Sequence, residues 1–301
     1  MLALLGLVAM IGLLAGLRWA VHRSLAPERI VETRTPADVG LSHQGITFPT
    51  ENGKSLFGWF IPASQSGSKD RSPCVVLLHG WGGNAETLLP LAQPLHEAGF
   101  ALLFINARCH GQSDEDTFAS MPRFAEDLGH AIDWLKQRDD IDPQAIGAIG
   151  HSVGAAASLL AASRRDDIAA VVSIAAFIHP VAMMRRWFAG RGIPYMPVGW
   201  LMLRYVEWVI GPRFDDIAPI NTIRWVQCLV LLVNGAEDDT VPVSEAHAIY
   251  ANRSGDHVQL KVVAGSHYDY ADLERELPVL VDFQLGVVKN ANEANSKNRC
   301  S

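Results

Sequence analysis

The chain has 301 residues, of which 49% are hydrophobic and 19% charged, and its formal net charge is −7. This composition is typical of a globular protein, and the acidic balance without basic runs argues against a nucleic-acid partner. The four cysteines show no C-x-x-C spacing, so we expect neither a disulfide framework nor a structural zinc site.

The N-terminal segment is strongly apolar. Residues 2–17 carry no charge, and the apolar stretch continues past Arg18 as far as residue 21. Because twenty helical residues span about 30 Å, the thickness of the hydrocarbon core, we predict a transmembrane anchor over residues 1–22. A cleaved signal peptide and a buried helix are the alternatives. The following charges, Arg18, Arg23 and Arg29, favour a cytoplasmic location for the rest of the chain.

Beyond this segment, the pattern predicts one α/β domain over residues 35–289. The expected strands cover residues 45–48, 55–61, 74–78, 100–105, 145–149, 168–175, 229–233 and 257–263. The expected helices cover residues 87–98, 121–138, 154–162 and 277–288. Alternating strands and helices indicate a mostly parallel sheet with helices on both faces. We predict that the polar residues 290–301 form a disordered tail.

Residues 177–225 interrupt this alternation and are rich in large apolar side chains. We predict a helical lid inserted into the domain. Trp200 and Trp208 are its candidate substrate-binding residues, because apolar side chains wall most small-molecule sites. A cap that packs only on its own core is the structural alternative, and contact with a membrane is compatible with either.

The pentapeptide 150–154 reads Gly-His-Ser-Val-Gly, after an apolar strand and before an Ala-rich helix. A serine between a strand and a helix, with glycine two residues away on each side, is typical of a nucleophile elbow. The sharp turn leaves no room for side chains at the two glycine positions. Ser152 is therefore the candidate nucleophile.

A serine hydroxyl needs a base to take its proton and an acid to orient that base. Asp238 lies in the loop after the strand 229–233, and His267 lies in the loop after the last strand. Both loops are expected at the carboxyl edge of the sheet, beside the elbow. Glu237 and Asp239 share the first loop and remain alternatives for the acid.

Together these motifs resemble the α/β-hydrolase family, in its membrane-anchored bacterial, serine aminopeptidase and esterase/lipase-like branch. The resemblance extends over residues 45–289 and is carried by the elbow and four further loops: His79-Gly-Trp-Gly-Gly83, Asn106-Ala-Arg-Cys-His-Gly-Gln-Ser113, Asp238-Asp-Thr-Val-Pro242 and Ser266-His267. Asn106 and Cys109 stand where the family usually has Asp and Gly, and Leu229 stands where many members have Pro.

The resemblance implies an oxyanion hole formed by two backbone N–H groups. One belongs to Val153, which follows the nucleophile, and the other comes from the loop after the third strand. We expect Trp81 to supply the second, because His79 and Gly80 allow its amide to turn inward. For His79 and His110 we expect packing and turn roles.

These features predict a serine hydrolase of the carboxylesterase or lipase type, which cleaves an acyl ester or thioester through an acyl-enzyme. No metal or cofactor is implied. A peptidase is the alternative within the class, with Glu207 as the candidate anchor for a free amino terminus. A membrane-tethered interaction protein without activity is the alternative outside it. The predicted location is the bacterial inner membrane, and the oligomeric state is not predicted.

Overall fold

The computed structural model of the chain describes residues 2–64, 71–267 and 283. Eight strands form one sheet in the order β1-β2-β4-β3-β5-β6-β7-β8. β2 is antiparallel to β1 and β4, and the remaining neighbours are parallel, which confirms the mostly parallel sheet. The strands are β1 Gln44–Pro49, β2 Ser55–Ile61, β3 Ser72–Leu78, β4 Ala101–Ile105, β5 Ile141–His151, β6 Ala170–Ile174, β7 Leu229–Gly235 and β8 Val258–Val263.

The central strands are buried on both faces, so their sequences are continuously apolar. In β3, Cys74, Val76 and Leu78 pack into one apolar cluster. Val75 and Leu77, which point to the other side of the sheet, pack into a second cluster. Successive side chains of a strand face opposite ways, so an unbroken apolar run is what a sheet covered on both faces requires.

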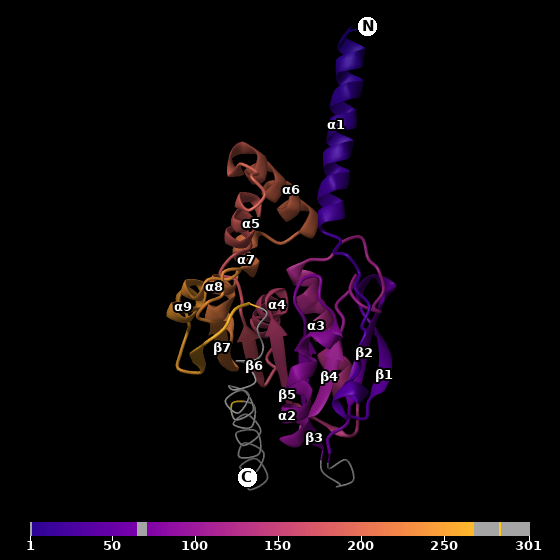
Figure 1. The fold of residues 1–301 in the computed structure, drawn as a ribbon, viewed down its shortest axis with the longest axis vertical. Helices are drawn as coiled ribbons and strands as arrows, with labels where there is room; N and C mark the ends of the chain where they lie inside the picture. The colour runs from indigo at the N-terminus through magenta and orange to yellow at the C-terminus, as the bar shows by residue number, and fades with distance from the viewer. Residues whose placement is uncertain (1, 65–70, 268–282, 284–301) are drawn as a thin grey trace.

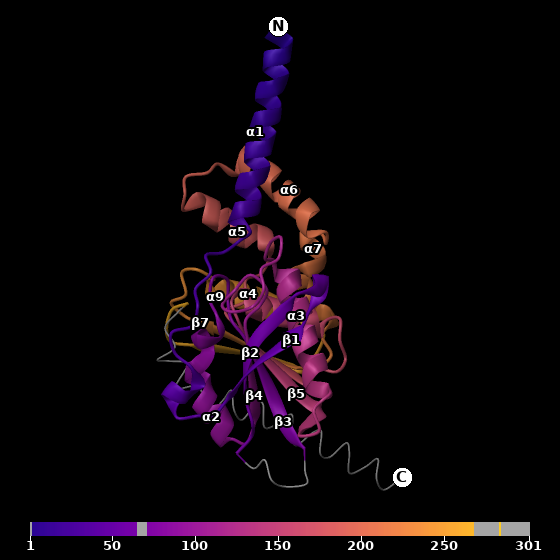
Figure 2. The ribbon, with the colours of Figure 1, turned by 90° about the vertical axis from the view of Figure 1, so that its right-hand side faces the viewer.

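Helices cover both faces. α3 Met121–Lys136 and α4 Val153–Ala162 contribute to the first cluster, and α2 Ala92–Glu97 to the second. Figure 2 shows α2 and α3 on opposite sides of the sheet. The helix predicted over residues 87–98 begins as a 3-10 helix, Ala85–Leu91, because Pro90 lies inside it. α9 Val243–Ala251 was not predicted.

The expected helical insertion is present between β6 and β7. Its helices are α5 Pro180–Ala189, α6 Trp200–Ile210, α7 Phe214–Ile217 and α8 Pro219–Thr222. Figure 1 shows α5 and α6 beyond the sheet, at the end of the molecule from which α1 projects. That the insertion closes over a substrate as a lid stays a prediction.

α1 covers Leu2–Ser24, so the predicted N-terminal segment is helical. Its last turns contact the rest of the protein: Val21 is buried, and His22 pairs with the Tyr205 hydroxyl at 3.2 Å. In the part of the chain that the structure describes, no helix has the length and apolar character to cross a membrane. The transmembrane anchor is therefore not supported by the structure.

Two predicted segments lie outside the described residues. These are the helix over residues 277–288, of which only Phe283 is described, and the tail over residues 290–301. Phe283 packs against the second apolar cluster. The outer limits of the predicted domain, residues 35–289, stay a prediction.

Candidate active site

Ser152 occupies the turn between β5 and α4, with φ 54° and ψ −113°. Few non-glycine residues adopt a positive φ, and such strain is typical of functional sites. The two flanking glycines are required by space. A Cβ at Gly150 would lie 2.3 Å from the Gly154 carbonyl oxygen, and a Cβ at Gly154 would lie 2.4 Å from the carbonyl oxygens of Leu78 and His79. The sequence pattern and the local geometry therefore agree on a nucleophile elbow.

Three side chains predicted from separate loops form a hydrogen-bonded chain. His267 Nε2 lies 3.2 Å from Ser152 Oγ, and His267 Nδ1 lies 2.8 Å from Asp238 Oδ2. The carboxylate can only accept, so Nδ1 carries the proton and Nε2 presents its lone pair to the serine. All three side chains are buried. The geometry is that of a nucleophile, a base and the acid that orients the base.

Asp238 is held as a carboxylate by its surroundings. Its Oδ1 accepts hydrogen bonds from the backbone N–H groups of Thr240, at 2.9 Å, and Val241, at 2.7 Å. Burial by itself would raise the pKa of this carboxyl, but the hydrogen bonds from His267, Val241 and Thr240 outweigh burial and lower it below its usual value. The side chain is therefore ionised at neutral pH.

Within the described part of the chain, neither alternative acid of this loop forms a hydrogen bond with the His267 ring. Asp239 is exposed and accepts a 3.4 Å hydrogen bond from the hydroxyl of Thr240. Glu237 is also exposed, and its Oε2 accepts the Gly265 N–H at 2.6 Å. Glu237 thus ties the acid loop to the loop that carries His267. Sequence reasoning missed this role, because nothing in the sequence pairs a carboxylate with a backbone group 28 positions away.

His151 supports the base from the other side. Its Nε2 donates to the His267 carbonyl oxygen at 3.0 Å, and the two rings are 4.8 Å apart. Burial, together with the neighbouring His267, lowers the pKa of His151 to about 4. The His151 side chain therefore holds the backbone of the loop that carries His267.

The loop predicted to supply an oxyanion donor lies directly against the nucleophile. A Cβ at Gly80 would be 3.2 Å from the Cβ of Ser152. Among the described residues, neither the N–H of Trp81 nor that of Val153 has a hydrogen-bond acceptor. Val153 is also the first residue of α4, where the helix dipole favours negative charge. Both amides therefore remain candidates for holding an oxyanion.

Two buried histidines brace this loop. His110 Nδ1 donates to the Arg108 carbonyl oxygen at 2.9 Å, while its Nε2 accepts the Gly82 N–H at 3.2 Å. His79 Nδ1 donates to the Gly80 carbonyl oxygen, and its Nε2 accepts the Ala107 N–H. Each ring must be neutral to make both bonds. Burial lowers the pKa of His79 well below its usual value and that of His110 to about 4.

A His110→Gln variant tests this brace through pH. The folded pKa of His110 lies below the unfolded value of 6.5, so the unfolded chain binds the extra proton between pH 6.5 and 4. Its contribution to stability is present above pH 6.5 and is lost as the pH falls toward 4. Gln cannot titrate. As the pH falls from 6.5 to 4, the unfolding free energy of the native protein should therefore decrease by about 3 kcal/mol more than that of the variant. Urea titrations of the two proteins measure this difference. If the unfolding free energies of the two proteins depended on pH in the same way, His110 could not be neutral in the folded state.

The structure does not bring the predicted substrate-binding tryptophans to the catalytic side chains. Trp200 and Trp208 lie on α6 and are exposed. The ring of Trp208 contacts Tyr205, with centroids 5.7 Å apart. Within the described residues, no hydrogen bond or ring contact joins either tryptophan to Ser152 or His267. Their role in substrate binding stays a prediction.

Glu207, the candidate anchor for a peptide amino terminus, has structural partners. Its Oε1 accepts the backbone N–H of Phe214 at 2.7 Å, and its Oε2 forms an ion pair with Arg204. The carboxylate therefore ties the end of α6 to α7. This arrangement removes the one acidic group that favoured the peptidase alternative.

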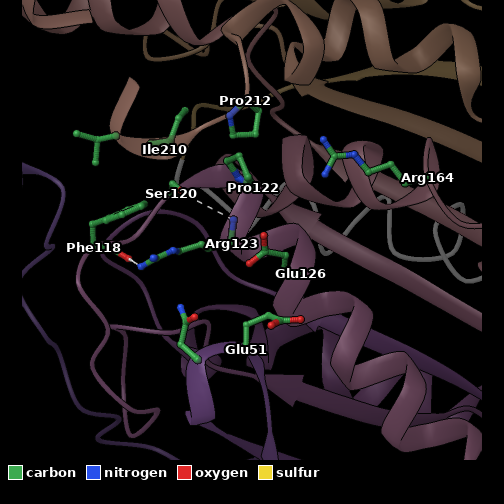
Figure 3. A pocket seen from close by; sticks show the side chains of 11 residues that line it. Glu51, Phe118, Ser120, Pro122, Arg123, Glu126, Arg164, Ile210 and Pro212 are labelled. Carbon is green, nitrogen blue, oxygen red and sulfur yellow. Dashed lines mark hydrogen bonds between the residues drawn. The ribbon is translucent and has the colours of Figure 1, made fainter. Parts of the chain in front are cut away.

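A hollow of about 380 Å³ lies between the N-terminus of α3 and the end of α6 (Figure 3). Ser152, Asp238, His267 and the loop 79–83 are not among the residues that line it. Its central charged groups already have partners: Arg123 bonds to the Phe118 carbonyl and pairs with Asp116, and Glu126 pairs with Arg108. Among the described residues, no cluster of histidine, cysteine and carboxylate side chains is arranged to hold a metal ion. The expectation that no cofactor is needed stays a prediction.

The sheet order and the strand–turn–helix at Ser152 define an α/β fold of the hydrolase type. The sequence model for serine aminopeptidase, S33, matches residues 69–214. Uncharacterized protein YfhR of Salmonella typhimurium is 25% identical over 280 residues, 86% of each chain. The Pyrococcus furiosus esterase Pf2001 matches with a TM-score of 0.69 and 24% identity, over 87% of this chain and 97% of the esterase. Est1E of Butyrivibrio proteoclasticus, solved with ferulic acid bound, matches with a TM-score of 0.65 and 20% identity, over 81% of this chain and 99% of Est1E.

The chain has the fold of the α/β-hydrolases, and its residues 69–214 are similar to the serine aminopeptidase, S33, family. The predicted resemblance is thereby confirmed at the level of the family.

Proposed function

We propose that this protein is a serine hydrolase that cleaves carboxylic esters through an acyl-enzyme. One observation carries the proposal: Ser152, His267 and Asp238, from three separate loops, form a continuous hydrogen-bonded chain at a strained elbow. Hydrogen bonds in the order serine, histidine, aspartate activate a serine that would otherwise be a weak nucleophile.

In the first half-reaction, Ser152 Oγ attacks the acyl carbonyl while its proton passes to Nε2 of His267. Asp238 stabilises the imidazolium that forms, since its carboxylate already accepts the Nδ1 proton. The negative charge that develops on the carbonyl oxygen is held by the backbone N–H groups of Val153 and Trp81. Each such donor is worth about 3 kcal/mol in the transition state. His267 then protonates the leaving alcohol, and the acyl group stays on Ser152.

In the second half-reaction, His267 takes a proton from water, and the hydroxide that forms attacks the acyl-enzyme. The same oxyanion donors act again. Collapse of the intermediate releases the acid, and the proton on His267 returns to Ser152 Oγ. A thioester would follow the same route with a thiol as the leaving group.

Esters are favoured over peptides by two observations. The similar structures include two proteins described as an esterase and as Est1E with ferulic acid bound. Glu207 is engaged with Phe214 and Arg204, so it is not available for a substrate amino group. A peptidase remains the second candidate, because the matching sequence model is described as serine aminopeptidase.

A series of p-nitrophenyl esters separates the two candidates. Each methylene buried in an apolar acyl site contributes about 0.8 kcal/mol, close to fourfold in kcat/KM. We therefore expect kcat/KM to rise by roughly 15-fold from acetate to butyrate. Fast cleavage of aminoacyl anilides with negligible butyrate turnover would establish the peptidase instead.

A further inference from the structure

The helical insertion presents large apolar side chains to solvent. On α6, Leu201 and Trp208 are seven residues apart and therefore lie on the same side of the helix, 56% and 71% exposed. Met196, Val198 and Trp200, at and just before the start of α6, are exposed as well. We call these five residues the insertion face. Exposed apolar side chains gathered in this way mark surfaces that contact another apolar phase.

The same segment is basic, although the chain as a whole is acidic. Between residues 180 and 213 there are five arginines and one carboxylate, Glu207, whereas the chain carries a net charge of −7. Arg186, Arg204 and Arg213 pair with Glu245, Glu207 and Asp215, so the positive charge of the segment rests on Arg185 and Arg191. Arg185 and Arg191 are exposed and stack on the rings of Tyr195 and Trp187. Their guanidinium groups lie over these rings, 4.5 and 3.8 Å from the ring centroids, so positive charge sits directly beside aromatic surface.

α1 continues this surface. Its described side chains include four exposed apolar residues, Leu5, Met10, Ile11 and Trp19. Residues 1–27 contain no acidic residue. The contact between His22 and Tyr205 joins α1 to α6, and Figures 1 and 2 both show α1 at the same end of the molecule as α5 and α6. One end of the protein therefore combines exposed apolar groups with positive charge.

We propose that the insertion face docks on an anionic phospholipid surface. Trp208 and Leu201 enter the boundary between headgroups and acyl chains, and Arg185 and Arg191 lie at the phosphates. Amphipathic helices with tryptophan and leucine beside arginine bind membranes in this way. A second copy of the chain fits less well, because a two-fold contact would bring arginine-rich surfaces of the same sign together. The proposal requires no membrane-spanning helix and does not depend on hydrolytic activity.

The first test uses the full-length protein with phosphatidylglycerol-containing vesicles whose acyl chains carry bromine, which quenches tryptophan fluorescence on contact. Trp208→Phe is compared with Trp225→Phe. Trp225 is a matched control because it is 70% exposed and lies shortly before the amino end of β7, whereas α5 and α6 follow the carboxyl end of the parallel strand β6. We expect Trp208→Phe to remove a measurable part of the quenching and Trp225→Phe to remove none. Equal losses in the two variants, or no loss in Trp208→Phe, would overturn the proposal.

The second test examines charge through the same signal, the quenching that depends on Trp208. Each arginine near an anionic membrane contributes about fivefold in binding, so Arg185→Gln with Arg191→Gln should raise the lipid concentration for half-maximal quenching by roughly 25-fold. Arg71→Gln with Arg224→Gln is the control, since both side chains are exposed and precede the strands β3 and β7. Equal binding to vesicles of phosphatidylcholine alone, or self-association through Trp208 without lipid, would contradict an anionic membrane as the partner.

Discussion

Ser152→Ala is expected to lower kcat for p-nitrophenyl butyrate by about 10⁶-fold, the scale on which loss of a triad member acts in serine hydrolases. The variant removes the only atom that forms the covalent bond in the proposed route. Stability should change little, because the elbow depends on the space at Gly150 and Gly154 and Ala differs from Ser only by the hydroxyl. The measurements are initial rates with purified protein and the melting temperature.

His267→Ala serves as the companion to this variant. The double variant should be little slower than either single one, because the nucleophile and base act as a unit. Undiminished hydrolysis by Ser152→Ala, at an unchanged melting temperature, would mean that the reaction takes place elsewhere.

The second large effect is expected for Asp238→Asn, at roughly 10⁴-fold in kcat. The backbone N–H groups of Thr240 and Val241 both donate to Oδ1, so an asparagine at this position keeps its oxygen there. Its amide group then faces His267 Nδ1 and donates to it. The imidazole is forced to carry its proton on Nε2, where it can no longer accept the proton of Ser152.

Asp239→Asn is the matched control, one residue along the same loop and exposed. Its kcat should change by less than about tenfold, since within the described part of the chain its carboxylate pairs with the hydroxyl of Thr240 and not with His267. If Asp239→Asn caused the large loss of kcat and Asp238→Asn the small one, Asp239 would be the acid that orients the base. Steady-state kinetics of both variants on the same ester decide the matter.

The main elements of the site could be predicted because they leave local signals. The elbow requires two glycines around a serine, and both prove sterically necessary. The positions of Asp238 and His267 follow from parallel strands, which end at one edge of the sheet. The choice of Asp238 over its neighbours came from the family's loop pattern rather than from chemistry.

The braces around the site could not be predicted, because each joins residues distant in the sequence. His110 reaches Gly82, and Glu237 reaches Gly265, both 28 positions away. A sequence contains no sign of such pairs until the loops are placed together.

The two departures from the family's turn motif have local explanations. Asn106 accepts the N–H of Ala85 through Oδ1 and donates to Glu32 through Nδ2. An aspartate there would place a second carboxylate against Glu32, so the amide fits this chain. Cys109 adopts φ 68° where the family has glycine, and its thiol is held by the backbone of Asp116.

The exposed positions of the insertion were also beyond prediction. Its aromatic residues were expected to wall an acyl site, yet Trp208 is 71% exposed and contacts Tyr205. Amino-acid composition shows that a segment is apolar. It does not show which surface the apolar side chains contact, because that depends on how the helices pack in the folded protein. The link between His22 of α1 and Tyr205 of α6 is a tertiary contact of this kind.

The most direct test of the account is labelling with a fluorophosphonate probe, which forms a covalent bond only with an activated serine. We expect one adduct, located by mass spectrometry of the digested protein on the peptide that contains Ser152. Asp238→Asn should label far more slowly, because its base holds the wrong tautomer. An unlabelled native protein, or an adduct on another serine, would contradict the assignment of Ser152 as the nucleophile.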